Sequence, residues 1–499
     1  MTVRVAYLGV DAGTSGCKAI LLGGDGRVLA SAWQGYPTRR RLDGEVSQRA
    51  DDWLRAAART IRACAEAAPA RIEALSVTAP AHAAVLVGDG GRPLSRVLLT
   101  FDGRATRIAA ALRRAYGRAF FERSFVDLSP AWTLPQLVWL RQRLPEAWPR
   151  IRAVLIGKDY IRYRMTGELA TDPTDAAGTA MYDPLAGRWL EVAREDTGLR
   201  PDQLPPVLPA LSVGGRLTRN WAHRTGLPNG TPVAVGATDT AAELYSLGAV
   251  GDGAGLVKIA STGTVVCVSD QPHPHPGVLT YPHCLPGRWY TLAATNTAAT
   301  AYAWLAAAVF DQQDPGTPDS FEAMDALARR VPPGAGGVLF LPFLDGERSP
   351  HWDRDLRAAF LGVAGGHGRA HLCRAVLEGV AFSLRSCRDL LAGLGLRVER
   401  PFLTGGGVRS SLWRSILVSV LGQAGCWMEP HGPALGAARL AAAAVDGGRP
   451  PAVIRRSTVT VRPRADWQAR YSAVFDTYAE AVDALQATSH RLARAARED

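Results

Sequence analysis

The sequence predicts an α/β protein made of two similar domains that face each other across a cleft. A strand–turn–strand unit with small residues in its turn opens the chain, and the same unit returns near the middle. Each copy is followed by further apolar strands and by segments with helical spacing. A glycine-rich joint at residues 248–255, GAVGDGAG, separates the copies, so we place the domains at 1–248 and 249–499.

The first half follows a strand, turn, strand, turn, strand, helix, strand order. VAYLGV and KAILL flank the opening turn, and GGDG at residues 23–26 marks a second hairpin turn. Residues 51–67 place apolar side chains at helical spacing, and residues 72–78, IEALSVT, read as a buried strand.

The second half repeats this order with longer helices. We expect a strand, a Thr-Gly-Thr turn and a strand over residues 255–270, then a third strand at 289–295. Further expected elements are a helix at 300–310, a strand at 337–343, a helix at 369–394, a strand at 400–406, a helix at 411–422 and an amphipathic tail helix from residue 466.

Length and composition fit a globular protein with two or more domains. The chain has 499 residues, 47% of them hydrophobic, and it lacks an apolar run of the roughly 18 residues that a membrane helix needs. Its seven cysteines form no C-x-x-C pair, so we expect reduced thiols and no zinc framework. These features, with an N-terminus that differs from a signal peptide, predict a cytoplasmic protein without a membrane partner.

The net charge of +11 does not by itself predict a nucleic-acid partner. The arginines are spread over most of the chain and are not interleaved with aromatic residues, which favours a solvated surface that attracts small anions. The three lysines are Lys18, Lys158 and Lys258. Two of them, Lys18 and Lys258, lie beside the two Gly-Thr turns.

The opening turn, GVDAGTSGCK, supports two interpretations. Asp and Gly are ordinary residues of a hairpin turn. Small residues also let consecutive backbone N–H groups surround a phosphate, and a carboxylate such as Asp11 could then hold Mg²⁺. The second turn, at Gly263 and Thr264, favours a nucleotide held by both halves, although the chain has no P-loop motif.

Two further motifs follow apolar strands. TGGGVRSSLW, at residues 404–413, would allow a ribose or a flat ring to approach the backbone, or it is a plain strand-to-helix turn. In GATDTAAE, Asp239 lies where a strand ends and a helix begins. It is either a helix cap together with Thr238, or a general base that accepts a proton from an attacking hydroxyl.

These motifs together resemble the FGGY-type carbohydrate kinases, and most closely the xylulose kinases. The motifs are GVDAGTSGCKAILL, GATDTAAE, STGT, FLPFLDGERSPHWDRDLRAAFLGV and TGGGVRSSLWRSILVSVLG, and the resemblance extends from about residue 5 to residue 445. It implies two duplicated actin-like (ribonuclease H-like) ATPase domains and ATP-dependent phosphorylation of a sugar hydroxyl.

The resemblance also implies roles for individual residues. Asp239 would be the catalytic base, and Asp11 would assist catalysis by holding Mg²⁺, with Asp239 as a second candidate metal ligand. The residues expected to contact ATP are Gly13, Thr14 and Lys18 from the first half and Gly263, Thr264, Gly406 and Gly407 from the second.

Sugar recognition departs from the family pattern. The family has Met-His-Gly where this chain has Ala81-His82-Ala83, and it has an asparagine where this chain has Thr240. Asp102 stands in a stretch that carries a sugar contact in the family. The expected substrate-binding residues are therefore Ala81, His82, Asp102, Asp239 and Thr240, around a pocket wider than the family's.

The predicted activity is phosphorylation of a terminal hydroxyl of a ketopentose, with D-xylulose as the first candidate. A kinase for another ketose or polyol, such as ribulose, a deoxyketose or a tetrulose, is the alternative within the class. A non-catalytic actin-like ATP-binding protein is the alternative outside it, and a general base at Asp239 argues against that class. The sequence leaves the oligomeric state open, with a homodimer as one candidate.

Overall fold

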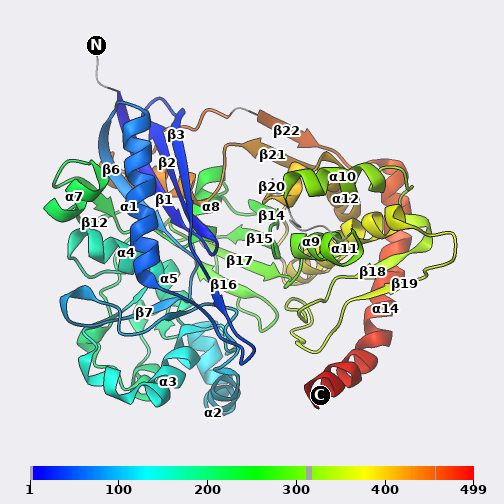
Figure 1. Cartoon of the computed structure of the whole chain (residues 1–499), viewed down its shortest axis with the longest axis horizontal. Helices are drawn as coiled ribbons and strands as arrows, with labels where there is room; N and C mark the ends of the chain where they lie inside the picture. Colours follow the sequence, from blue (N-terminus) through cyan, green and yellow to red (C-terminus); the bar gives the residue numbers. More distant parts are fainter. Residues whose placement is uncertain (1–3, 311–316, 456, 499) are drawn as a thin grey trace.

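The computed structural model describes residues 4–310, 317–455 and 457–498. Two large mixed β-sheets occupy opposite halves of the molecule, and helices flank both of them (Figure 1). The strands of the first sheet all end by residue 234, and those of the second all begin at residue 255 or later. The two halves of the chain therefore form separate sheets, and the α/β class is confirmed.

The first sheet contains the opening strand–turn–strand unit. Strands β1, β2 and β3 are antiparallel, β6 is parallel to β1, and β13 is parallel to β6. In spatial order the strands are β12 (Val213–Arg216), β13 (Pro232–Ala234), β6 (Arg71–Thr78), β1 (Val5–Ala12), β2 (Gly16–Gly23) and β3 (Val28–Gly35).

The second sheet repeats this arrangement. Strands β14, β15 and β17 are antiparallel, β20 is parallel to β14, and β21 is parallel to β20. In spatial order the strands are β16 (Leu279–Pro282), β17 (Trp289–Ala294), β15 (Gly263–Ser269), β14 (Gly255–Ile259), β20 (Phe402–Thr404), β21 (Gly425–Glu429) and β22 (Ser457–Val461). The predicted duplication is therefore present in the strand topology.

Two helices link the halves because each packs against the other half. Helix α13 (Pro433–Val445), from the second half, lies on β1, where a Cβ atom on Gly9 would come within 1.9 Å of the carbonyl oxygen of Ala434. Helix α8 (Asp239–Leu247), from the first half, buries Leu244 and Tyr245 in one cluster with second-sheet side chains, and Figure 1 shows it between the sheets. A Cβ on Gly436 would lie 1.8 Å from the carbonyl oxygen of Ala242, so glycine permits the close contact of the two helices.

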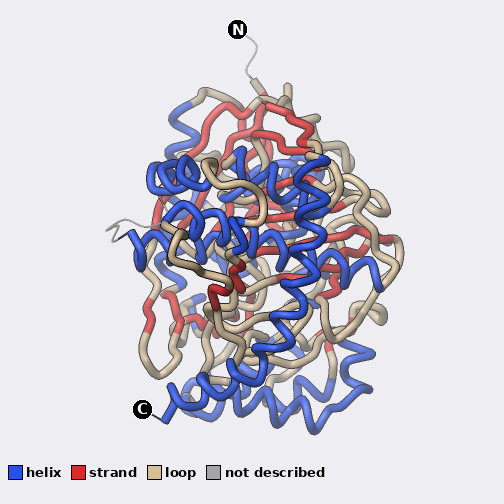
Figure 2. The backbone as a smooth tube through the Cα atoms, turned by 90° about the vertical axis from the view of Figure 1, so that its right-hand side faces the viewer, coloured by secondary structure: helices blue, strands red, loops and turns tan. Residues whose placement is uncertain are grey.

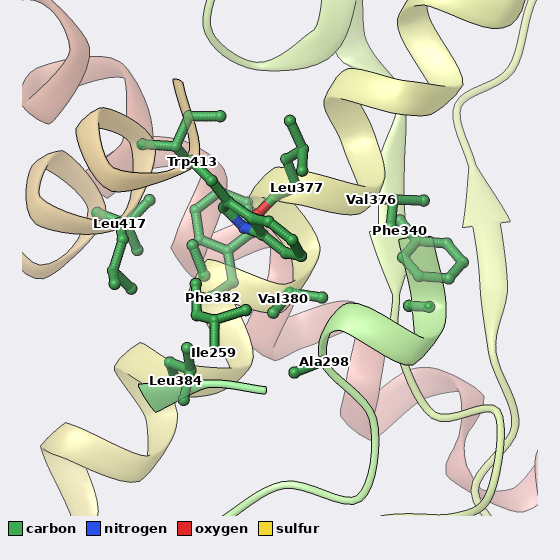
Figure 3. Packing of buried hydrophobic residues seen from close by; sticks show 14 of the residues in the cluster. Ile259, Ala298, Phe340, Val376, Leu377, Val380, Phe382, Leu384, Trp413 and Leu417 are labelled. Atoms are coloured by element: carbon green, nitrogen blue, oxygen red, sulfur yellow. The ribbon is translucent and has the colours of Figure 1, made fainter. Parts of the chain in front are cut away.

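The core of the second half surrounds α11 (Arg369–Gly393). Trp413, on α12 (Ser411–Leu421), packs on it and donates a hydrogen bond of 3.0 Å to the carbonyl oxygen of Leu377 (Figure 3). The predicted tail helix is present as α14 (Ala465–Glu498), which runs to the C-terminal end of the molecule, far from the N-terminus (Figure 2). Its Tyr471 and Tyr478 are buried in the same core.

Other elements were predicted only in part. The strand expected at 337–343 is present as β18 (Leu339–Leu341), but it pairs with β19 (Ala359–Leu361) in a small sheet of its own. The predicted helices at 51–67 and 300–310 are α1 (Ala50–Ala67) and α9 (Ala299–Phe310).

The long connection between β6 and β13 folds into smaller elements. Its helices are α2 (Thr106–Ser124), α3 (Thr133–Arg143), α4 (Gly157–Thr166), α5 (Pro173–Gly178), α6 (Glu191–Thr197) and α7 (Arg219–Thr225). Its strands are β7 (Ala84–Val87), β8 (Val97–Leu98), β9 (Ala153–Ile156), β10 (Tyr182–Asp183) and β11 (Arg188–Trp189), together with β12 of the first sheet. Elsewhere the described residues also form β4 (Arg39–Arg40), β5 (Val46–Gln48) and α10 (Pro318–Ala328).

All seven cysteines are buried free thiols. Among the described residues, no helix combines the length and the apolar character that crossing a bilayer requires.

A buried ion cluster fixes the segment that follows α4. The ammonium of Lys158 lies 2.6 Å from a carboxylate oxygen of Asp159, 3.0 Å from one of Asp172 and 3.1 Å from one of Asp175, and all four side chains are at most 1% exposed. Burial raises the pKa of Asp175, although the charge of Lys158 opposes that rise. Lys158 contacts all three desolvated carboxylates, and the charge of the buried Arg162 also acts on Asp159.

We predict that Lys158→Met lowers the free energy of unfolding by about 3–5 kcal/mol, because it leaves the carboxylates buried without their cation. The midpoint of urea unfolding measures this loss. Arg118→Met is the matched control, since its side chain is 89% exposed and its pair with Glu122 should contribute less than about 1 kcal/mol. Equal midpoints for the two variants would show that Lys158 does not hold the cluster together.

Candidate active site

Asp239 is the first residue of α8 and lies at the boundary between the two halves. The strand β13 before it ends at Ala234. Gly236 follows two residues later, and its φ of +80° and close approach to the carbonyl oxygen of Val77 leave no room for a side chain. The backbone N–H of Asp239 donates a 3.2 Å hydrogen bond to the carbonyl oxygen of Ala79. The end of β6 thereby fixes where α8 begins and where the carboxylate stands.

The Asp239 carboxylate is desolvated, and burial raises its pKa above the ordinary value. The charge of Lys258 opposes that rise, as does a 2.7 Å hydrogen bond from the N–H of Thr240 to Oδ1. These two interactions favour the ionised carboxylate, which is the form that accepts a proton.

Asp11 faces the same charges from the end of β1. Burial and the negative charge of Asp239 raise the pKa of Asp11 to about 7, while Lys258 opposes the rise. Oδ1 of Asp11 is buried, and among the described residues none donates a hydrogen bond to it. The position therefore suits a cation that would take the place of the absent donor.

Lys258 brings a positive charge from the second half to these carboxylates. It lies on β14, and its ammonium forms a 2.7 Å ion pair with Oε2 of Glu243, one helical turn after Asp239. Burial would raise the pKa of Glu243, but Lys258 and then His431 outweigh it and lower the pKa to about 2. The pair holds α8 against the second sheet while leaving Lys258 within electrostatic reach of Asp11 and Asp239.

The two Gly-Thr turns differ in how they are held. In the first, the side-chain amide of Gln48 donates a 2.7 Å hydrogen bond to the carbonyl oxygen of Thr14, and the Tyr36 hydroxyl donates to that of Gly13. In the second, the N–H of Gly263 donates to the Thr295 hydroxyl at 3.0 Å. That N–H is therefore engaged inside the protein, and the expected contacts of Gly263 and Thr264 with ATP stay predictions.

Of the remaining predicted nucleotide contacts, Lys18 and Gly406 are exposed and Gly407 is buried. Lys18 is exposed on β2, opposite Asp11 in the β1–β2 pairing. Gly406 is exposed, and a Cβ added to it would meet no atom within 4 Å, whereas one on Gly407 would approach Ile259 to 2.4 Å. Open space at Gly406 is compatible with a ligand there, and Gly407 serves packing against β14.

His82 is held in a defined orientation by the first half. Its Nδ1 bonds to the carbonyl oxygen of Gly178 at the end of α5, and its ring contacts Trp132 edge-on at 4.4 Å between centroids. Burial, with the charge of Arg348 as a smaller contribution, lowers the pKa of His82 to about 4 although the bond to Gly178 opposes this. A neutral ring that donates through Nδ1 keeps Nε2 as a hydrogen-bond acceptor.

Thr240 and Asp102 contact protein groups. The Thr240 hydroxyl lies 3.3 Å from Oδ1 of Asp239 and so touches the candidate base. The Asp102 carboxylate is fully buried, with Arg104 at 2.7 Å and the N–H of Val46 at 3.0 Å. A direct sugar contact of Asp102, predicted from the sequence, would have to displace one of these partners, and it stays a prediction.

Sequence reasoning missed three residues of this region. The sequence motifs gave no individual role to Glu243, Gln48 or Arg348. The signal for Glu243 was its spacing, four residues after Asp239 and so on the same face of the helix. Gln48 and Arg348 carried no such local signal, because tertiary packing alone brings them here.

Among the described residues, no three His, Cys, Asp or Glu side chains are arranged to form a metal site. Mg²⁺ is usually bound by one or two carboxylates, water and substrate phosphates, so the expected ligands Asp11 and Asp239 stay predictions. Asp11, with its unpartnered buried oxygen, fits that role better than Asp239, whose Oδ1 already accepts from Thr240.

Comparisons with known proteins agree with this architecture. Residues 6–246 match the N-terminal domain of the FGGY family of carbohydrate kinases, and residues 256–445 match its C-terminal domain. The xylulose kinase of Escherichia coli (strain K12) is 32% identical over 440 residues, which cover 87% of this chain and 89% of that protein. The gluconokinase of Bacillus subtilis (strain 168) is 25% identical, with 83% and 82% covered.

Solved structures show the same relationship. The xylulose kinase from Rhodospirillum rubrum superimposes with a TM-score of 0.87 at 27% identity, covering 97% of this chain and all of that one. With both family domains matched in order, and with an E. coli relative above 30% identity over most of its length, the chain belongs to the FGGY family of carbohydrate kinases and is an ATP-dependent sugar phosphotransferase.

Proposed function

We propose that the chain transfers the γ-phosphoryl group of ATP to a terminal hydroxyl of a ketopentose, with D-xylulose as the first candidate. The observation that carries this proposal is the desolvated carboxylate of Asp239, held at the N-terminus of α8 with Lys258 opposing its protonation. Relatives named xylulose kinase support D-xylulose as the substrate. The relative named gluconokinase is the reason for testing other sugars, sugar acids and polyols as well.

Asp239 accepts the proton of the attacking hydroxyl in this proposal. Transfer of a phosphoryl group needs little covalent chemistry from the protein, so orientation of the nucleophile and stabilisation of charge are its main tasks. The bond to Ala79 and the contacts with Thr240 fix where the carboxylate stands. The charge of Lys258 opposes the rise in the pKa of Asp239 that burial causes, and the ion pair of Lys258 itself is with Glu243.

Asp11 would hold Mg²⁺, directly or through its waters. When bound, the ion would neutralise charge on the phosphates. Thr14 and Lys18 from the first half and Thr264 from the second would contact the phosphates, and Gly406 would border the adenosine. Because both halves contribute, productive binding depends on how α8 and α13 hold them together.

His82 would orient the sugar. Its Nε2 is an acceptor in the neutral tautomer that the Gly178 carbonyl selects, so it can accept a hydrogen bond from a sugar hydroxyl. Ala81 and Thr240 depart from the methionine and asparagine of the family pattern. Alanine in place of methionine at position 81 leaves space beside His82, and threonine in place of asparagine at position 240 shortens a polar side chain. Both changes favour a shifted or relaxed preference for the sugar.

An ADP-release assay with purified protein, Mg·ATP and a panel of ketoses, polyols and sugar acids tests the proposal. Release that depends on a ketopentose supports it. Release that depends on a polyol or sugar acid alone would move the substrate to the alternative class, and ATP binding without any sugar-dependent release would favour the non-catalytic alternative.

We predict that Asp239→Asn lowers kcat by about 10²–10⁴-fold, because the amide keeps the shape but does not accept the proton. ATP binding, measured by calorimetry, should stay within about threefold of the unmodified protein. Asp202→Asn is the matched control, since Asp202 is an exposed residue paired with Arg200. Turnover of Asp239→Asn within threefold of the unmodified protein would remove Asp239 from the mechanism.

We predict that Asp11→Asn raises the Mg²⁺ concentration needed for half-maximal rate by about tenfold or more, because one anionic ligand is lost. A magnesium titration at saturating ATP measures the change. If the requirement is the same in both proteins, Asp11 is a turn residue and the ion is held elsewhere.

We predict that the double variant Ala81→Met and Thr240→Asn raises kcat/KM for D-xylulose relative to D-ribulose. Methionine fills space beside His82, and asparagine offers a longer polar group, which discriminates between hydroxyl arrangements more strongly than apolar contact does. Competition between the two sugars measures the ratio directly. An unchanged ratio would show that these positions do not set specificity.

A further inference from the structure

Arg348, in the loop between β18 and β19, is a partly buried cation without an anionic partner. Its Nη2 donates a 2.9 Å hydrogen bond to the carbonyl oxygen of Thr295. Within the described part of the chain, no carboxylate forms an ion pair with the guanidinium, and its buried Nε has no acceptor. Burial lowers the pKa of Arg348, and the charge of Glu347 opposes this. An unpaired, desolvated cation costs free energy that a bound anion would offset.

The carboxylate of Glu347 is held by other groups. Its Oε1 accepts from the backbone N–H of Asn296 at 2.6 Å and from the backbone N–H of Arg348 at 2.8 Å. Its Oε2 lies 3.3 Å from the hydroxyl of Ser383. The neighbouring carboxylate therefore binds backbone and hydroxyl groups, and the guanidinium of Arg348 keeps donors for a ligand.

The contact with Thr295 places Arg348 beside the second Gly-Thr turn. The Thr295 hydroxyl accepts from the N–H of Gly263 at 3.0 Å, and the N–H of Thr295 donates to the carbonyl oxygen of Gly263 at 2.9 Å. Gly263 and Thr295 are buried, whereas Thr264 is partly exposed. Since Thr264 is proposed to contact the phosphates of ATP, Arg348 is anchored next to the proposed phosphate site.

The charge of Arg348 also reaches the residues around the candidate base. Burial chiefly lowers the pKa of His82, and the charge of Arg348 adds to that effect. Burial raises the pKa of Tyr281, where the charge of Arg348 opposes the rise and the charge of Asp239 adds to it. The ring of Trp132 contacts both His82 and Tyr281, with centroids 4.4 and 6.5 Å apart. Arg348 therefore lies between the second turn and the site of Asp239.

We propose that Arg348 binds the phosphoryl group that passes from ATP to the sugar. The inference rests on the proposed function, since it concerns the same reaction. In that reaction the hydroxyl oxygen of the sugar forms a bond to the γ-phosphorus. The bond from the γ-phosphorus to the bridging oxygen breaks with its electron pair going to ADP, and Asp239 takes the hydroxyl proton. The planar guanidinium suits this group, because its N–H donors match the spacing of phosphoryl oxygens.

Binding of nucleotides without turnover is the first test. Arg348→Met should weaken binding of the β,γ-imido analogue of ATP by about tenfold or more, because the γ-phosphoryl oxygens lose a charged donor. ADP lacks that group, so its affinity should stay within about threefold. Calorimetry with Mg²⁺ present measures both. Arg354→Met is the matched control, since Arg354 lies in the same loop with a side chain that is 68% exposed.

Two outcomes of the binding test would overturn the proposal. An equal loss of affinity for ADP and for the imido analogue would show that Arg348 supports the turn through Thr295 and does not bind the γ-phosphoryl group. No loss for either nucleotide would show that it contributes nothing to the site. If Arg348→Met does not fold, Arg348→Lys takes its place, and the loss should again be larger for the imido analogue.

Turnover supplies the second test. We expect Arg348→Met to lower kcat by about 10²-fold or more, with KM for the sugar within about threefold. Arg348→Lys keeps the charge without the planar donors, so its kcat should lie between those of Arg348→Met and the unmodified protein. A kcat of folded Arg348→Met within about threefold of the unmodified protein would overturn the proposal. If the unmodified protein shows no sugar-dependent ADP release, the proposed function fails, and the nucleotide comparison still decides whether Arg348 binds the γ-phosphoryl group.

Discussion

The site depends on one desolvated cation, Lys258, which extends from the second sheet toward three carboxylates of the first half. Glu243 forms the direct ion pair with Lys258. The charge of Lys258 also lowers the pKa values of Asp11 and Asp239, but both stay raised because the effect of burial is larger. The half-buried ammonium is compensated only when the two halves are together. The exchange of α8 and α13 between the halves supplies that proximity, and the glycines at positions 9 and 436 permit the contact. The Lys258–Glu243 ion pair and the packing of α8 and α13 therefore both hold the two halves of the molecule together.

This arrangement divides the work among the residues. The first half supplies the candidate base, the candidate magnesium ligand and the candidate sugar contacts, and the second half supplies the compensating charge and the second turn. Lys158 performs the equivalent task inside the first half, where it holds three carboxylates and so fixes α5, whose last residue carries the carbonyl that orients His82. Two of the three lysines in an arginine-rich chain thus pair with buried carboxylates, Lys158 fully buried and Lys258 partly exposed.

Local sequence patterns predicted much of the fold. The duplicated strand–turn–strand units, the parallel strand after each, and the long helices of the second half have strong periodicity, and the structure contains them. The pattern did not predict that β18 pairs outside the main sheet or that α8 and α13 exchange partners, because pairing and helix docking depend on contacts distant in sequence. For the site, Asp11 and Asp239 were recognisable at strand ends, whereas the partners of Lys258, His82 and Asp102 were set by tertiary packing.

The central claim is that the site couples ATP to a sugar hydroxyl and does not hydrolyse ATP for another purpose. Phosphorus NMR of the purified protein with Mg·ATP and a ketopentose tests it most directly, because it identifies the acceptor of the phosphoryl group. The account predicts ADP and a sugar phosphate monoester in equal amounts, with little product when the sugar is omitted. Inorganic phosphate formed at the same rate with and without sugar, and no monoester, would contradict it.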